Sequence, residues 1–370
     1  MQQRVIISQD IEHDLAQAIA ETEHDRVFVL TDDITQECCL PKVASLFAKH
    51  NATTITIRHD DTNKTLATLA DVWTALQRGG ATRHSLLVNL GGGMVTDLGG
   101  FAAATFKRGI NFINIPTTLL AMVDAAVGGK TGINFGGLKN EVGAFANARY
   151  VIVNTCFLDT LDTANLCSGY AEMLKHSLIS NAQMWAEHVN FDILQPDLAE
   201  LQRMVAASIA VKEHIVADDP HEHGIRKALN FGHTIGHALE EFSMQQPGGA
   251  VVSARLLPLA RARTAPKNTL LHGYAVAFGL IGELYISARK AGFPTARLHQ
   301  TARFIRENYG AVAFTCDDYS TLLNLMRHDK KNTSDTINFT LLHDIGDIRI
   351  NQTATDEEIR EALDFIREGY

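Results

Sequence analysis

The sequence predicts an α/β fold in which a Rossmann-like domain precedes a domain that is almost wholly helical. Short β-rich runs alternate with amphipathic stretches through about the first 155 residues, as in mostly parallel sheets. The periodic segments after Asp159 have almost only helical spacing. We therefore expect a nucleotide-binding α/β domain in residues 1–158 and a helical metal- and substrate-binding domain in residues 159–370.

The individual elements follow from these patterns. Strands are expected at residues 4–8, 26–31, 53–58, 85–89, 112–116 and 150–154. Helices are expected at residues 65–78, 164–179, 198–217, 225–242, 272–291, 295–309 and 356–368, with Asp356 as a candidate cap of the last one. A small hairpin is expected from residues 336–342 and 347–351.

Composition excludes several classes of protein. Apolar residues make up 46% of the chain, which is enough for a sizeable core and argues against disorder. The net charge is −9 and no Lys/Arg-rich run is present, so a nucleic-acid partner is not expected. Five cysteines without C-x2-C spacing are typical of a reducing compartment. No segment has the composition of a signal peptide or a membrane span, which predicts a cytoplasmic protein with no membrane partner.

A glycine-rich loop is the first candidate for ligand binding. The strand before Gly91-Gly92-Gly93 leads into a small-residue helix, whose first N–H groups favour a pyrophosphate. A simple tight turn is the alternative interpretation, because the spacing differs from G-x-G-x-x-G. Asp97 is expected in the first helical turn, where it could cap N–H groups or bind a polar part of the ligand. Thr117 and Thr118 follow a strand end, where ligands bind in open α/β sheets.

Two lysines near glycine pairs suggest an anion clamp. Lys130 follows Gly128-Gly129, and Lys139 precedes Asn140 after a second glycine pair. Isolated lysines are usually surface residues. Two of them on glycine-rich turns, near Asp124, favour a site for phosphate or carboxylate.

The segment 225–242 contains a second group of candidate residues. On a continuous helix, five polar side chains would fall within an arc of roughly 80°: Arg226, Asn230, His233, His237 and Glu240. Histidines four residues apart, with an Asn and an Arg, could hold a metal ion and an oxyanion. Ordinary surface or hydrogen-bonded histidines are the alternative.

A carboxylate upstream could complete a metal site. Glu172 shares a helical face with Lys175 and His176 in a mostly apolar stretch, although Glu–Lys pairs at this spacing are usually surface ion pairs. Glu172, His233 and one more histidine would form the three-ligand set of an open catalytic zinc site. Spacing alone leaves His237 and His272 as alternatives for the third ligand.

The segment Ser243–Leu271 interrupts the helical pattern. It contains three arginines, one lysine, three prolines and no acidic residue. One interpretation is a surface insertion, because long loops cost little closure entropy. The other is a basic flap over an anionic site.

Taken together, the chain resembles the 3-dehydroquinate synthase family of sugar-phosphate cyclases. The resemblance extends from about Arg26 to Leu342, through GGGMVTDLGGFAAATFKRG, IPTTLLAMVDAAVGGKTGIN, AEMLKH, LNFGHTIGHALE, LHGYAVAFGL and DKKN in the family's order. It implies NAD+, one divalent metal ion (Zn2+ or Co2+), a phosphorylated keto acid substrate and a homodimer.

The resemblance also implies roles for individual residues. The metal ligands would be Glu172, His233 and His272, with His237 in proton transfer. NAD+ would bind to Asp61, Lys64, Gly91, Gly92, Gly93, Met94, Val95, Thr96, Asp97, Thr117, Thr118, Lys130, Lys139, Phe157, Leu158, Asp159 and Thr160. Catalytic or substrate contacts would come from Arg108, across a dimer interface, and from Asp124, Lys130, Asn140, Lys175, Lys212, Arg226, Asn230 and Lys330 or Lys331. Two residues depart from the family pattern: Asp61 and Tyr274 stand where Glu is usual.

The implied reaction converts 3-deoxy-D-arabino-heptulosonate 7-phosphate to 3-dehydroquinate and phosphate. It proceeds by transient oxidation, β-elimination of phosphate, re-reduction and an intramolecular aldol reaction. Another sugar-phosphate cyclase and a metal-dependent polyol dehydrogenase are the alternatives. A dehydrogenase would not need the lysine cluster of Lys130, Lys139, Lys175 and Lys212.

Overall fold

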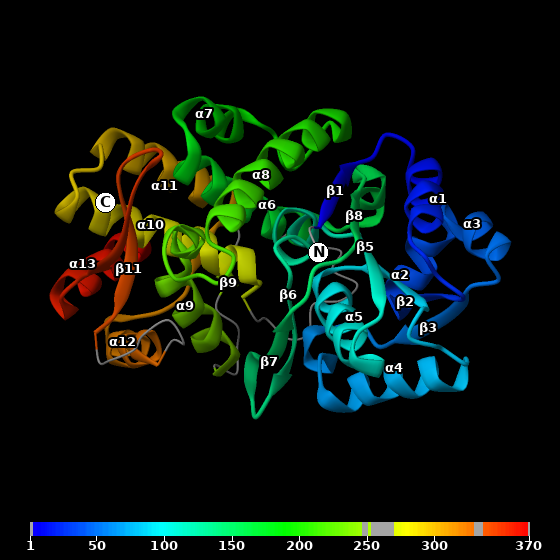
Figure 1. Cartoon of the computed structure of the whole chain (residues 1–370). Helices are drawn as coiled ribbons and strands as arrows, with labels where there is room; N and C mark the ends of the chain where they lie inside the picture. The colour runs from blue at the N-terminus through cyan, green and yellow to red at the C-terminus, as the bar shows by residue number, and fades with distance from the viewer. Residues whose placement is uncertain (1–2, 246–250, 253–269, 329–335, 369–370) are drawn as a thin grey trace. The chain divides into compact units, whose positions relative to one another are not determined.

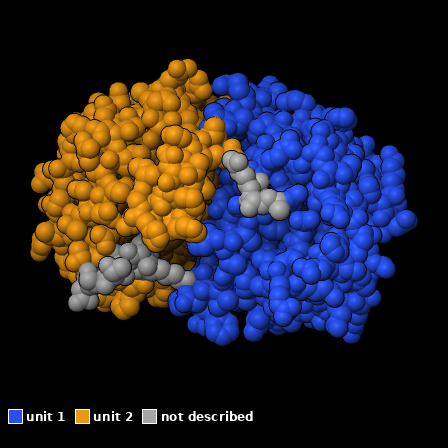
Figure 2. Space-filling model, in the orientation of Figure 1, with its two compact units in different colours: residues 1–161, 197–209 blue, residues 162–196, 210–370 orange. Residues whose placement is uncertain are grey.

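The computed structural model describes residues 3–245, 251–252, 270–328 and 336–368. The chain forms two compact units (Figure 2). Unit 1 comprises Met1–Leu161 and Asp197–Ile209, and unit 2 comprises Asp162–Pro196 and Ala210–Tyr370. The assignment of separate functions to residues 1–158 and 159–370 stays a prediction.

Unit 1 is built on a six-stranded parallel sheet with the strand order β1-β8-β5-β4-β2-β3 (Figure 1). Its strands are β1 (Arg4–Ile7), β2 (Val27–Asp32), β3 (Thr53–Ile57), β4 (Leu86–Gly91), β5 (Asn111–Pro116) and β8 (Tyr150–Val153). Every residue of β2, β4 and β8 is buried, as expected for parallel strands covered on both faces. The predicted parallel α/β sheet is confirmed.

Helices surround this sheet. They are α1 (Ile11–Glu21), α2 (Asp33–Cys38), α3 (Ala44–Lys49), α4 (Leu66–Arg78) and α5 (Gly93–Thr105). Thr65 caps α4 by accepting a hydrogen bond from the Thr68 N–H. The Trp73 indole of α4 donates to the Ala102 carbonyl of α5 at 3.3 Å, which joins the two helices.

A two-stranded antiparallel hairpin, β6 (Lys130–Phe135) and β7 (Leu138–Phe145), also belongs to unit 1. The sequence analysis placed Lys130 and Lys139 on glycine-rich turns, and this was wrong. Both lysines lie on strands: Lys130 begins β6, and Lys139 is the second residue of β7. The glycines form the turns beside them, because antiparallel pairing needs extended residues on each side of a tight turn.

Unit 2 is mainly helical, as predicted. Its helices are α6 (Thr163–Ser180), α7 (Ala182–Asn190), α9 (His233–Gln245), α10 (His272–Lys290), α11 (Thr295–Tyr309), α12 (Tyr319–Arg327) and α13 (Asp356–Glu368), and α8 (Leu198–Asp218) continues into it from unit 1. Helix α10 packs against α6, α9, α11 and α13. The predicted hairpin is confirmed as β11 (Asn338–Asp344) and β12 (Asp347–Thr353), and a short pair joins β9 (Val251–Val252) to β10 (Ala311–Val312).

The predicted continuous helix at residues 225–242 is wrong. A 3-10 helix covers Ile225–Asn230, and α9 begins only at His233. Gly232 separates them with φ of 80°, a left-handed conformation that interrupts a right-handed helix. The 100° spacing therefore does not relate Arg226 and Asn230 to the two histidines.

The predicted cap of the last helix also needs correction. The N-terminus of α13 is capped by Thr355, whose hydroxyl accepts from the Glu358 N–H, whereas Asp356 forms an ion pair with Arg327. Among the described residues, no helix is both long and apolar enough to cross a membrane.

Candidate functional site

The glycine loop and the threonine pair of unit 1 lie together, as expected from the parallel sheet. β4 ends at Gly91 and its neighbour β5 ends at Pro116. The Thr117 N–H donates to the Gly91 carbonyl at 3.0 Å. A Cβ added to Gly92 would lie 3.0 Å from Thr118 Cγ2, so a side chain at Gly92 would crowd the pair. Helix α5 then starts at Gly93 without a side-chain cap, which leaves its first N–H groups available to an anion.

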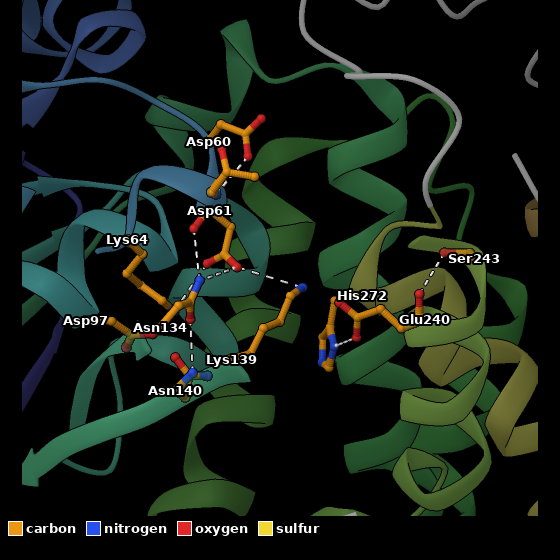
Figure 3. Close-up of polar contacts among 11 residues, drawn as sticks. Asp60, Asp61, Lys64, Asp97, Asn134, Lys139, Asn140, Glu240, Ser243 and His272 are labelled. Carbon is orange, nitrogen blue, oxygen red and sulfur yellow. Dashed lines mark hydrogen bonds and ion pairs between the residues drawn. The ribbon is translucent and has the colours of Figure 1, made fainter. Parts of the chain in front are cut away.

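Asp97 has a different place from the one predicted. It lies beyond the first turn of α5 and caps no N–H group. Its carboxylate instead binds Lys64 Nζ at 3.0 Å, and the same ammonium lies 3.2 Å from Asp61 Oδ1 (Figure 3). The side chain of Lys64 is only 5% exposed. One buried cation therefore joins two predicted NAD-binding acids.

The pKa values in this cluster follow from burial and charge. Burial raises the pKa of Asp97 to about 6, even though Lys64 favours its ionised form. For Asp61, burial is outweighed by Lys64 and Lys139, and its pKa is lowered. Burial would lower the pKa of Lys64, but the two carboxylates outweigh it and raise the pKa. Lys64 therefore stays protonated at neutral pH, whereas Asp97 takes up a proton as the pH falls through about 6.

The β6–β7 hairpin supplies further polar groups to this cluster. The Asn134 side-chain amide donates to the Asp61 carbonyl oxygen at 2.9 Å, and its oxygen accepts from the Asn140 N–H at 2.9 Å (Figure 3). Asn140 has φ of 50°, and Lys139 Nζ lies 3.8 Å from Asp61 Oδ2. The structure thus brings Asp61 together with Lys139 and Asn140, which come much later in the sequence.

Other predicted residues of unit 1 are placed separately. Arg108 is exposed and has φ of 69°, directly after Lys107 with φ of 49°. Lys130 is exposed at the start of β6, and Asp124 lies in the short helical segment Ala121–Ala125. In the segment Thr155–Thr160, Phe157 and Leu158 are buried, whereas the exposed Asp159 pairs with Lys42 at 2.7 Å.

Unit 2 brings three predicted metal ligands together. Glu172 Oε1 lies 3.3 Å from His233 Nε2 and 3.4 Å from His272 Nε2. The ligand atoms of all three residues lie within 4.8 Å of one another. A tetrahedral ion with bonds of about 2.1 Å would separate its ligand atoms by about 3.4 Å. The observed separations therefore fit a zinc or cobalt ion.

The two histidines are held from behind by other acceptors. His233 Nδ1 lies 3.1 Å from the Phe231 carbonyl, and His272 Nδ1 lies 2.9 Å from Glu240 Oε2 (Figure 3). Such contacts orient Nε2 toward a metal, as in carboxylate–histidine–metal arrangements. Burial would lower the pKa of His272, but the carboxylates of Glu240 and Glu172 outweigh it and raise the pKa to about 10. A metal on the Nε2 side would displace one proton while Glu240 kept the other.

Glu172 is an ionised carboxylate in a buried place. It is fully buried on α6, where Oε2 faces the Lys175 ammonium and Oε1 faces the two histidine Nε2 atoms. Burial would raise its pKa, but Lys175 and His233 hold the pKa well below its usual range. Lys175 forms the predicted ion pair with Glu172, and both side chains are buried rather than at the surface. An ionised, buried carboxylate whose Oε1 faces two histidine Nε2 atoms can bind a cation together with them.

His237 lies beside this group. Its ring centroid is 5.2 Å from that of His233 and 5.8 Å from that of His272. His237, Glu240 and His272 also form a set of possible ligands. Since Glu240 is at hydrogen-bond distance from His272 Nδ1, the buried set containing Glu172 fits a metal better.

The predicted oxyanion groups lie in the segment before α9. Arg226 is buried and donates to the Pro220 carbonyl at 2.5 Å, while Asn230 donates to Glu222 Oε1 at 2.7 Å. Lys212 is buried on α8. Tyr274, at the position where Glu is usual, is buried and packs edge-on against Tyr309. Lys330, Lys331 and most of Ser243–Leu271 lie outside the described residues.

Sequence reasoning missed several polar residues around these groups. Glu240 was named on the polar face of this segment with His233 and His237, but its contact with His272 was not predicted. Asn134 and Glu222 had none, since their contacts depend on how a hairpin and a loop fold back.

Comparison with known proteins agrees with this arrangement. The family model for the 3-dehydroquinate synthase N-terminal part matches residues 54–168, and that for the C-terminal part matches residues 169–257 and 260–332. A 3-dehydroquinate synthase of Parabacteroides distasonis is 50% identical over 369 residues, covering 100% of this chain and 99% of that protein.

Two solved structures share the fold. A 2-deoxy-scyllo-inosose synthase complexed with carbaglucose-6-phosphate, NAD+ and Co2+ has a TM-score of 0.81 at 23% identity, covering 100% of this chain and 96% of that one. A 2-epi-5-epi-valiolone synthase from Streptomyces hygroscopicus with NAD+ and Zn2+ has a TM-score of 0.79 at 22% identity, covering 100% and 98%. From the family models and the full-length relative, the chain belongs to the 3-dehydroquinate synthase family.

Proposed function

We propose that the chain converts 3-deoxy-D-arabino-heptulosonate 7-phosphate to 3-dehydroquinate and inorganic phosphate, a lyase reaction of the shikimate pathway that leads to chorismate and aromatic amino acids. Membership of the family supports this activity. The observation in the structure that carries it is the close approach of Glu172 Oε1 to the two histidine Nε2 atoms, at 3.3 and 3.4 Å. A cation held there would polarise the hydroxyl group that NAD+ oxidises.

The proposed ligand groups are divided between the units. The glycine loop, the threonine pair and the Asp61–Lys64–Asp97 cluster would hold NAD+, and Glu172, His233 and His272 would hold Zn2+ or Co2+. The N-terminus of α5 offers positive charge to a pyrophosphate. When bound, NAD+ and the metal supply a hydride acceptor and a Lewis acid.

The protein's own side chains would bind charge and move protons. Lys175, Lys212 and Asn230 would stabilise oxygen atoms that become negative during oxidation and elimination. His237, whose ring lies beside those of the two proposed histidine ligands, would accept the hydroxyl proton and return it later. Arg226 and the exposed Lys130 and Arg108 would bind phosphate or carboxylate with charge-assisted bonds.

Glu222 adds a feature to this scheme. Its carboxylate accepts the amide hydrogen of Asn230 that we assign to the substrate. A substrate oxyanion at Asn230 would have to replace or share this contact. The 3-10 segment and its loop would therefore adjust when substrate binds.

We also propose a cytoplasmic homodimer. All five cysteines are free, as expected in a reducing compartment. Lys107 and Arg108 adopt consecutive left-handed conformations, which non-glycine residues rarely do, and Arg108 is exposed, so that a partner subunit could contact it. Light scattering after gel filtration measures the mass: a monomer at working concentration contradicts the dimer.

The activity is tested by measuring inorganic phosphate and absorbance at the NADH band during reaction of metal-loaded protein with catalytic NAD+. We expect phosphate in proportion to substrate and no net NADH, because the hydride that leaves the substrate returns to it. Folded, metal-loaded protein that releases no phosphate refutes the assignment. Accumulating NADH with a polyol indicates the dehydrogenase alternative, and phosphate release with only a sugar phosphate lacking the carboxylate indicates another cyclase.

A further inference from the structure

Glu283 is a buried acid that the proposed reaction does not use. It lies on α10, is fully buried, and receives backbone hydrogen bonds from the start of another helix. Its Oε2 accepts from the Gly232 N–H at 2.7 Å, and its Oε1 accepts from Thr234 at 2.9 Å and Ile235 at 3.2 Å. Burying a carboxylate is costly unless such bonds satisfy it, so these contacts hold it firmly in place.

The bonds of Glu283 replace a cap that α9 lacks. Helix α9 begins at His233, and the residue before it, Gly232, has no side chain that could accept the first N–H groups. A helix N-terminus normally needs such an acceptor. Glu283 supplies it from α10, and its negative charge also faces the positive end of the helix dipole.

This cap surrounds a metal ligand. The N–H groups of Gly232 and Thr234, one on each side of His233, bind the two oxygens of the same carboxylate. The backbone on both sides of His233 is therefore fixed to α10. The first residue of α10 is His272, the other histidine ligand.

The two helices run antiparallel, and their contacts define one register. Gly232 lies against Leu280, Gly236 lies against Ala275, and Glu240 accepts from His272. Glu283 joins α10 to the start of α9. The Glu240–His272 contact joins the two helices again, about three turns earlier on α10. A shift of α9 along α10 would move His233 away from His272. The contacts that each histidine makes within its own helix would not reverse this shift.

We propose that Glu283 is a positioning residue that sets the place of His233 in the metal site by capping α9 from α10. The inference rests on the proposed function in that it takes Glu172, His233 and His272 as the metal ligands. Without the carboxylate, the first turn of α9 frays and His233 Nε2 no longer faces Glu172 at a fixed distance.

The test compares Glu283→Gln with the wild type and with Thr355→Ala. Gln keeps the shape but loses the charge, and its NH2 group faces a backbone N–H. Thr355→Ala removes a capping bond of α13, a helix of the same unit without ligands. Co2+ affinity of the apo proteins is measured by competition with a chelator, together with the Co2+ absorption spectrum. Thermal unfolding of each apo protein shows that it is folded.

We expect Glu283→Gln to weaken Co2+ binding by about ten-fold and to alter the Co2+ spectrum, while Thr355→Ala matches the wild type. Wild-type affinity and spectrum in a folded Glu283→Gln protein overturn the inference, even if its melting temperature falls. If Glu283→Gln does not fold, Glu283→Asp, which keeps the charge but withdraws the carboxylate from the N–H groups of α9, is compared with the wild type in the same two measurements, and wild-type affinity and spectrum again overturn the inference. Wild-type protein that binds Co2+ but releases no phosphate refutes the proposed function instead, and the variant affinities still decide the role of Glu283.

Discussion

Replacing Gly279 by alanine tests how closely α9 and α10 must approach. A Cβ at this position would lie 1.9 Å from the Gly232 carbonyl oxygen and 2.8 Å from the Gly236 nitrogen. Both atoms belong to the backbone, so no rotamer change relieves the clash. Because real Cβ contacts are essentially never shorter than 3.0 Å, the start of α9 must move from α10 by about 1 Å.

The expected magnitude follows from this displacement. Overpacking a well-packed core costs about 1–3 kcal/mol, and alanine recovers up to about 1 kcal/mol of helix propensity. Since the clash involves rigid backbone, we expect a net loss of about 2 kcal/mol in the free energy of unfolding. Metal–ligand distances tolerate changes of only about 0.2 Å, so a 1 Å shift of His233 should also weaken Co2+ binding by at least about ten-fold.

Gly282→Ala is the matched control on the same helix. Its Cβ would meet Cδ1 of Ile235 at 2.6 Å and Cδ1 of Ile366 at 2.8 Å, which are flexible ends of side chains. We expect this variant to stay within about 1 kcal/mol of the wild type and to bind Co2+ normally. Urea unfolding of the apo proteins and Co2+ titration measure both effects. Equal stability and equal Co2+ affinity of the two variants refute the argument.

Three further predictions concern charge and metal. Because burial raises the pKa of Asp97 to about 6, against 3.8 for an ordinary aspartic acid, the folded protein holds a proton that the unfolded chain has released. This group's contribution to stability is therefore fully present below about pH 4 and is lost as the pH rises from there through about 6. Asp97→Asn should remove this part of the pH dependence of urea unfolding between about pH 4 and 6, and an unchanged slope contradicts the shift. Lys64→Met leaves Asp61 and Asp97 without their shared cation and should lower the free energy of unfolding by about 3 kcal/mol. A double variant with Asp97→Asn should regain part of this stability, and additive effects of the two substitutions would argue against the pairing. Removal of metal by a chelator should abolish phosphate release. Added Co2+ should restore phosphate release in the wild type but not in His272→Ala. If Co2+ restores phosphate release in the variant, His272 is not a metal ligand.

The sheet could be predicted from the sequence because its strands are buried on both faces. Segments such as Leu86–Gly91 are continuous apolar runs bounded by turn residues, and that pattern is local. The ion pair of Glu172 with Lys175 was also local, since residues three apart on a helix are neighbours. Its burial depends on the helices that pack around α6, so spacing alone could not distinguish it from a surface pair.

The break at Gly232 shows where local periodicity misleads. The apolar spacing of residues 225–242 suits one helix, but a left-handed glycine divides it. Choosing between a helical and a left-handed glycine requires knowing what satisfies the freed N–H groups. That acceptor is Glu283, about fifty residues later in the sequence.

By itself, the sequence determined the parallel α/β sheet, the helical second part and the residue types of a metal and nucleotide site, since these depend on periodicity and on short motifs. Only the tertiary structure decided which groups meet: Asn134 with Asp61, Glu240 with His272, and Glu283 with the start of α9. These contacts join residues far apart in the chain, and their distances depend on helix packing and turn geometry. No periodic pattern in the sequence carries that information, because the free energy that selects such contacts comes from burying whole elements together.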